Sequence, residues 1–205
     1  MKSSGGVAVL GIGNLVHADD GVGIHAIGVL RLDPRVPQGV VLVDGGTQGL
    51  SLLPHIAGFS RLLVVDAVEA GQPAGSLMCF KGKSLDGLPG KPSVHQLGFA
   101  DLMSAMFLMG DSPEEVVVLG VQPLSTAWVA ELTAPVRDAL HPLVDAVIAQ
   151  LAIWSTQLMS ADERIGFRRS SDNCSTESFR SLAAPPRTQK LCLPSGSGSI
   201  VTTSC

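Results

Sequence analysis

Several common signatures are absent from this chain of 205 residues. Its four cysteines form no C-x-x-C pair, so we expect neither a disulfide framework nor a cysteine zinc site; Cys79, in an apolar strand-like run, is expected to be buried and inert. No apolar run reaches the roughly 18 residues that a membrane-spanning helix needs, and no hydrophobic h-region of signal-peptide length follows Met1. We therefore expect a cytoplasmic protein without a membrane segment. Because there is also no Gly-x-Ser-x-Gly nucleophile elbow, a hydrolase with this sequence would use water as its nucleophile.

Charge is scarce, at 16% of the residues, and it is unevenly divided. Residues 1–155 hold 8 Lys and Arg against 14 Asp and Glu, a balance of −6, whereas residues 156–205 hold 6 against 4, a balance of +2. An acidic body is a poor nucleic-acid binder. Near Ser155 the composition changes to Ser, Thr, Arg and Pro. We therefore predict one domain over residues 1–155 and a Ser/Arg/Pro-rich tail over 156–205 that is disordered or loosely attached.

Strand-like and helix-like segments alternate along the body, which is typical of an α/β fold with a mainly parallel sheet. The segment 40–44 reads as a buried strand, and Thr47 is a plausible N-cap for the helix after it. The strand at 76–80 follows a connection too short for a crossover helix, so we predict an antiparallel edge strand. The fold predicted is a three-layer sandwich of about five strands with helices on both faces. The predicted strands are 7–11, 40–44, 62–65, 76–80 and 116–120, and the predicted helices are 20–32, 47–56, 94–109 and 130–151.

The loop after the first predicted strand resembles a nucleotide-binding loop, except that it is negatively charged where a phosphate would bind. Gly11 and Gly13 match the start of a dinucleotide fingerprint, but Val16 stands where the third glycine would be. Asp19 and Asp20 then stand where a pyrophosphate would bind, and two carboxylates there would attract a cation instead. A nucleotide-binding oxidoreductase domain remains the alternative, with Asp44 as its ribose-binding acid.

Three candidate metal ligands are expected at one edge of the sheet. Asp20 follows the first strand, Asp66 ends the third, and His95 stands at or just before the start of a helix. Loops that follow parallel strands meet at the carboxyl edge of such a sheet, so these residues can converge. Oxygen and nitrogen ligands of this kind suit a borderline divalent ion such as nickel or zinc. Simpler roles stay open for each: a helix cap for Asp20, a loop cap for Asp66, and a packed or solvated ring for His95.

Five short motifs in this order resemble the hydrogenase maturation proteases, endopeptidases that trim the C-terminus of the large subunit of nickel-iron hydrogenases. The resemblance covers about residues 7–150 and does not account for the tail. The motifs are Leu10-Gly11-Ile12-Gly13-Asn14 with Asp19-Asp20-Gly21-Val22-Gly23, then Val43-Asp44-Gly45-Gly46-Thr47, Val65-Asp66-Ala67, Ser93-Val94-His95-Gln96, and Gly120-Val121-Gln122-Pro123.

The resemblance implies a metal-dependent peptidase in which Asp20, Asp66 and His95 contact nickel and act in catalysis. Asp44, Asp19 and Gln96 would support these residues or orient the substrate. The partner implied is a nickel-iron hydrogenase large-subunit precursor that arrives with nickel already inserted, so the enzyme itself, expected to be a monomer, needs no permanent cofactor. A maturation chaperone that holds the nickel-loaded subunit without cutting it would need the same ligands and stays open.

Overall fold

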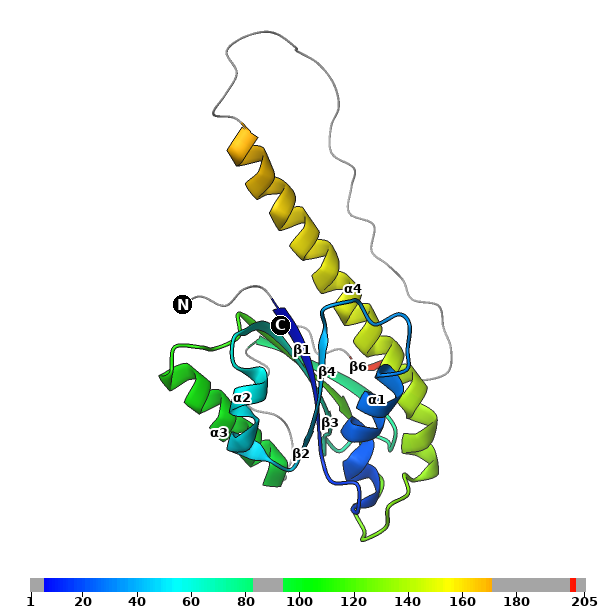
Figure 1. Cartoon of the computed structure of the whole chain (residues 1–205). Coiled ribbons are helices and arrows are strands. Elements are labelled where there is room, and N and C mark those ends of the chain that lie inside the picture. The colour runs from blue at the N-terminus through cyan, green and yellow to red at the C-terminus, as the bar shows by residue number, and fades with distance from the viewer. Residues whose placement is uncertain (1–5, 83–93, 171–199, 202–205) are drawn as a thin grey trace.

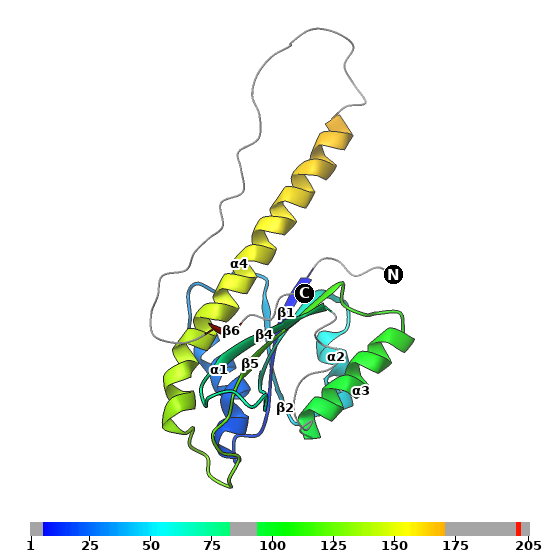
Figure 2. The same ribbon diagram turned by 180° about the vertical axis from the view of Figure 1, so that it is seen from behind.

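The computed structural model describes residues 6–82, 94–170 and 200–201. They form one sheet in the order β2-β1-β3-β5-β4-β6, with helices on both of its faces (Figures 1 and 2). The predicted three-layer α/β sandwich is therefore confirmed. The strands are β1 (Gly6–Ile12), β2 (Val41–Gly46), β3 (Phe59–Ala67), β4 (Leu77–Lys81), β5 (Glu115–Val121) and β6 (Ile200–Val201), and the helices are η1 (Ala18–Gly21), α1 (Val22–Leu30), η2 (Gly49–Leu52), α2 (Leu53–Ile56), α3 (Val94–Leu108) and α4 (Ala134–Ser170).

Four strands are parallel, because β1 pairs with β2 and β3, and β3 pairs with β5. β4 runs antiparallel to β5, as the short connection before it predicted, and the two-residue β6 pairs on its outer side. β2 differs from its prediction as a buried strand: it lies at the edge of the sheet, and Val41 and Asp44 are exposed. Both faces of β2 contact the core, Leu42 on the α1 side and Val43 on the side of α2, but both side chains are only partly buried. An apolar run alone does not distinguish such an edge strand from a central one.

Alternation along the strands divides the core into two layers. Val7, Val9, Leu63 and Val65 belong to the side that packs against α1 and α4. The opposite side packs against η2, α2 and α3. Its buried members are Ala8, Leu10, Ile12, Leu52, Ile56, Leu62, Val64, Leu102, Met106 and Val118.

Two predicted helices have different bounds in the structure. The helix predicted over 47–56 is replaced by η2 and α2, and Thr47 is not a cap, because the left-handed Gly49 (φ +49°) interrupts the segment and η2 has no side-chain cap. The helix predicted to end at residue 151 continues as α4 to Ser170, so the predicted boundary at 155 falls inside it. Trp154, fully buried, donates from Nε1 to Glu115 Oε2 at 2.8 Å and fixes α4 on the sheet there.

The segment 134–157 of α4 is long and apolar enough to cross a membrane by length and composition alone. Its apolar stripe is buried against the sheet, however, which is how a core helix uses the same hydrophobicity. The remainder of the predicted tail, 171–199 and 202–205, lies outside the described residues.

Candidate active site

Asp20 lies in η1, the short helix that follows β1. Gly13 has a φ of +133°, and a Cβ at Gly13 would stand only 1.8 Å from the carbonyl oxygen of Asp20. Only glycine lets the chain fold back this tightly. The N-cap position of α1 is occupied by Gly21, and the half-buried Asp20 stands in the first turn of η1.

Two further glycines bring η1 against the end of β3. A Cβ at Gly23 would lie 2.3 Å from the carbonyl oxygen of Val65, and one at Gly11 would lie 2.4 Å from the carbonyl oxygen of Gly23. The start of α1 therefore packs backbone against backbone on β1 and β3. Since Val65 directly precedes Asp66, this packing holds the Asp20 turn at the strand end that carries Asp66.

Asp66 is buried at the penultimate position of β3, where it is in register with Gly120 of β5. One carboxylate oxygen, Oδ1, accepts a hydrogen bond of 2.8 Å from the backbone N–H of Ala67. Asp66 alternates with Leu62 and Val64, which pack against the α3 layer. Its carboxylate is thus placed at the carboxyl edge of the sheet on the side of α3.

His95 and Gln96 lie in the first turn of α3, as predicted, but their side chains are outside the described part of the structure. The backbone places them near the same edge. A Cβ at Gly98 would stand 3.1 Å from the Cα of Gly49, so the first turns of α3 touch the segment that follows β2. Figure 1 shows α3 beginning at the end of the sheet where the loops after β1 and β5 lie. No group of three potential metal ligands occurs among the described side chains, so the nickel contact of Asp20, Asp66 and His95 stays a prediction.

Asp44 stands on the edge strand β2 in register with Gly11. Its Oδ1 accepts a hydrogen bond of 3.2 Å from the backbone N–H of Gly46, and the side chain is exposed. The supporting or substrate-orienting role predicted for Asp44 therefore has an accessible carboxylate one strand away from the Asp20 loop.

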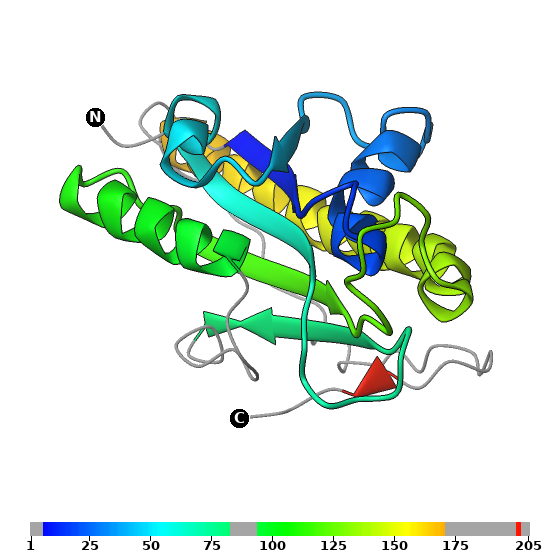
Figure 3. The same ribbon diagram turned by 90° about the horizontal axis from the view of Figure 1, so that it is seen from below.

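Asp19 faces inward and anchors the loop between β5 and α4. Its carboxylate is fully buried. Oδ2 accepts from the backbone N–H groups of Leu124 (2.8 Å) and Ser125 (3.0 Å) and from the Thr133 hydroxyl (2.8 Å), and Oδ1 accepts from the backbone N–H of Thr133 (2.7 Å). Asp19 thus fixes a loop more than 100 residues away in sequence, and its supporting role in the site stays a prediction. Figure 3 shows the two loops side by side.

Gln122 organises the loop that follows Asp66, a role that sequence reasoning did not assign although its motif was recognised. The side chain is buried. Its Oε1 accepts from the backbone N–H groups of Ala70 (2.8 Å) and Gln72 (3.1 Å), and its Nε2 donates to Glu69 Oε1 at 2.7 Å. A glutamine directly after a buried apolar strand is the signal that could have identified this contact.

Cys79 gives the site no thiolate nucleophile. It lies in β4, is a free cysteine, and is only partly buried rather than fully buried as predicted. Burial is the main cause that raises the pKa of its thiol, against a smaller opposite effect of Lys81. The thiol therefore stays protonated near neutral pH, as the inert state predicted for it requires.

Comparison with known proteins identifies the family. A family model described as "Hydrogenase maturation protease" matches residues 25–150. The hydrogenase expression/formation protein HupD of Bradyrhizobium diazoefficiens is 39% identical over 151 residues, which cover 72% of this chain and 79% of that protein. The hydrogenase 2 maturation protease of Escherichia coli is 33% identical over 147 residues, 71% of this chain and 90% of that protein.

A solved structure agrees with these relatives. The hydrogenase maturating endopeptidase HybD from E. coli aligns with a TM-score of 0.68 and 32% identity, over 72% of this chain and 92% of that chain. None of these relatives is described as a nucleotide-binding oxidoreductase, so the alternative built on Gly11, Gly13 and Asp44 has no support. The predicted family and peptidase class are confirmed: this chain belongs to the hydrogenase maturation protease family.

Proposed function

We propose that this peptidase removes the C-terminal peptide of a nickel-iron hydrogenase large-subunit precursor after nickel has been inserted. The observation that carries the proposal is the shared edge of Asp20 and Asp66, because glycine packing at Gly13 and Gly23 holds the Asp20 turn against the strand end that carries Asp66. Relatives of this chain are named as hydrogenase maturation proteases, which supports the substrate class.

In the proposed mechanism Asp20, Asp66 and His95 contact the nickel ion that the precursor carries. Two carboxylates and an imidazole match the ligand preferences of a borderline divalent cation. Contact with substrate-bound nickel would place the scissile peptide bond at this edge of the sheet and make cleavage depend on nickel loading. Nickel is then part of the substrate, and the enzyme needs no metal of its own.

Water is the proposed nucleophile, because the sequence has no Gly-x-Ser-x-Gly elbow and Cys79 lies in β4 with a raised pKa. Hydrolysis adds the water oxygen to the scissile carbonyl carbon and returns a proton to the leaving amine. The buried, water-poor position of Asp66 strengthens its interaction with a cation relative to bulk solvent. We also propose that the enzyme acts in the cytoplasm as a monomer.

The test compares a nickel-loaded large-subunit precursor with its nickel-free form and follows both by mass spectrometry. We expect loss of a C-terminal peptide from the nickel-loaded form only. Cleavage of both forms would show a peptidase without a nickel check. Binding of a verified cognate precursor without any cleavage would favour the maturation chaperone instead.

Substitutions of the proposed site residues test their roles in cleavage. Asp20→Asn and His95→Ala should each slow cleavage by at least about 100-fold, because the first removes the negative charge that attracts nickel and the second removes the imidazole ligand. Asp101→Asn is the matched control, since Asp101 is an exposed acid on the same helix as His95. Unchanged cleavage by both site variants, with melting temperatures equal to that of the wild type, would refute the assigned roles.

A further inference from the structure

An apolar, uncharged surface adjoins Asp20, and we call it the loop surface. Its side chains come from the loop between β1 and η1 and from the loop between β5 and α4. The exposed fraction reaches 80% at Trp128, although burial of such a ring is strongly favourable. Clustered exposed apolar side chains mark sites of interaction. The loop surface consists of Leu15, Val16, Leu124, Trp128 and Val129.

Direct contacts join the two loops and connect the loop surface to Asp20. The rings of His17 and Trp128 are in contact, with 4.1 Å between their centroids. The backbone N–H of Ala18 donates to the carbonyl oxygen of Val129 at 2.6 Å, and that of Asp20 donates to the carbonyl oxygen of His17 at 3.0 Å. The loop surface therefore borders the residue proposed to contact nickel.

The loop surface is also held in one conformation before any partner binds. Asp19 fixes Leu124, Ser125 and Thr133 through four hydrogen bonds to one buried carboxylate. Ala18 has a φ of +44° and is the one non-glycine residue with positive φ among the described residues. Strain of this kind persists where the surroundings enforce it, typically at functional sites. A preformed surface loses little conformational entropy on binding.

The chemistry of the loop surface selects its partner. Residues 11–18 and 122–130 contain no Lys, Arg, Asp or Glu. Binding to anionic membrane surfaces commonly uses basic side chains beside the apolar ones, and nucleic acids require basic side chains. An apolar stretch of polypeptide needs neither.

We propose that the loop surface binds an apolar, uncharged stretch of the large-subunit precursor, next to the bond that is cut. This inference rests on the function proposed above and adds a specificity element to it. Trp128, the most exposed of the five side chains, is the proposed anchor, since tryptophan is enriched among the residues that dominate binding at interfaces.

The test measures kcat and KM for cleavage of the nickel-loaded precursor by Trp128→Ala. We expect KM to rise by about tenfold or more, as truncation of an interface anchor does, with kcat at saturating precursor changed by less than about twofold, because binding lost equally from ground and transition state raises KM alone. Binding of the nickel-free precursor, followed by surface plasmon resonance, should weaken by a similar factor.

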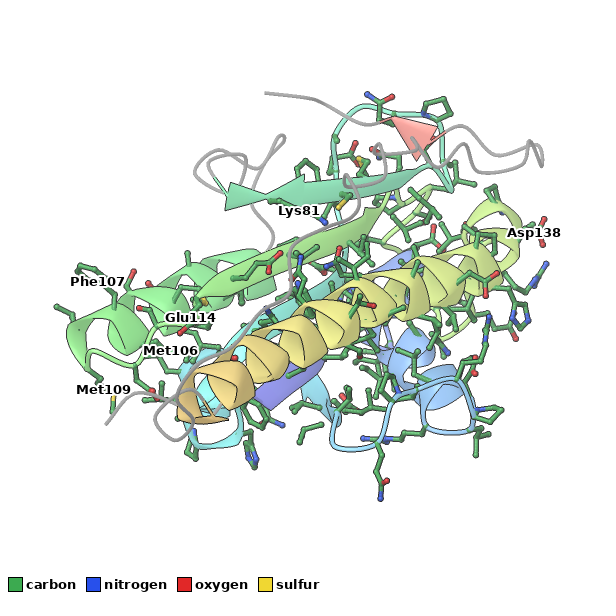
Figure 4. All side chains as sticks on the ribbon, turned by 90° about the horizontal axis from the view of Figure 1, so that it is seen from above. Lys81, Met106, Phe107, Met109, Glu114 and Asp138 are labelled. Atoms are coloured by element: carbon green, nitrogen blue, oxygen red, sulfur yellow. The ribbon has the colours of Figure 1, made fainter. Side chains whose placement is uncertain are left out.

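The matched control is Phe107→Ala, which removes an aromatic ring of similar exposure, 75%, at the far end of α3 (Figure 4). Its KM should equal that of the wild type. Val16→Ser guards against misfolding of the Trp128 variant: it truncates the other loop at an exposed position and should also raise KM.

The outcomes separate the two proposals. If the wild type does not cleave a verified nickel-loaded precursor, the proposed function fails. If the wild type cleaves and both loop-surface variants keep the KM of the Phe107 control, the docking proposal is overturned and the proposed function stands. A concentration-dependent dimer of the enzyme that Trp128→Ala disperses would also overturn it, because a second copy would then cover the loop surface.

Discussion

Removal of the Asp19 carboxylate should destabilise the protein more than most single substitutions do. The carboxylate is fully buried and accepts four hydrogen bonds, three from backbone N–H groups and one from a hydroxyl. Asp19→Ala leaves all four donors without an acceptor. Hydrogen bonds to a charged group contribute about 1.5–3 kcal/mol each.

The sum of these contributions is an overestimate. Ser125 and Thr133 are only partly buried and Leu124 is exposed, so water can replace some bonds. Loss of the buried charge also removes its desolvation cost. We therefore expect Asp19→Ala to lower the free energy of unfolding by about 3–5 kcal/mol.

Two further substitutions separate the contributions of the individual hydrogen bonds to Asp19. In Asp19→Asn the amide oxygen can keep the three donors at Oδ2, but the NH2 group then faces the N–H of Thr133, 2.7 Å from Oδ1 in the wild type. We expect a loss of about 2 kcal/mol, because one donor meets another donor. Thr133→Val removes a single bond and should cost about 1 kcal/mol.

The assay is urea unfolding followed by far-UV circular dichroism, with the free energy obtained by linear extrapolation. The predicted order of destabilisation is Asp19→Ala, then Asp19→Asn, then Thr133→Val. The reasoning is refuted if Asp19→Ala lies within about 1 kcal/mol of the wild type, since the four bonds would then contribute almost nothing.

Gly23→Ala should abolish cleavage and lower the free energy of unfolding by more than about 2 kcal/mol, because its Cβ would stand 2.3 Å from the carbonyl oxygen of Val65. The control for both measurements is Gly28→Ala in the same helix, where nothing lies within 4 Å of the added Cβ. The side-chain hydrogen bond from Arg35 is the main cause that lowers the pKa of Asp33 from 3.8 to about 2. A lowered carboxyl pKa stabilises the fold above the unfolded value, and the stabilisation is lost as pH falls from about 4 towards 2. An NMR titration should give that midpoint for Asp33 and a midpoint close to 3.8 in Arg35→Ala; equal midpoints in the two proteins would contradict the assignment.

Much of the fold could be predicted because its signals are local. Apolar runs such as Leu62–Val65 and the stripe at Val136, Leu143 and Val147 record the period of one element and the face that it buries. The position of a strand within the sheet, by contrast, depends on pairing with distant segments. The run at 40–44 is as apolar as a central strand, but β2 pairs with β1 alone among the described strands, so Val41 is exposed.

In the candidate site, too, sequence predicts the local features but not the contacts between distant segments. The sequence by itself determined that Asp66 ends a strand and that Asp20 stands in the segment after one, because residue type and position after an apolar run suffice for both. The full burial of Asp19 beside the half-buried Asp20 was decided by tertiary structure alone. Both acids stand in one short turn, but the donors that bind Asp19 are supplied by a loop 105 to 114 residues away, and no local pattern encodes a partner at that distance.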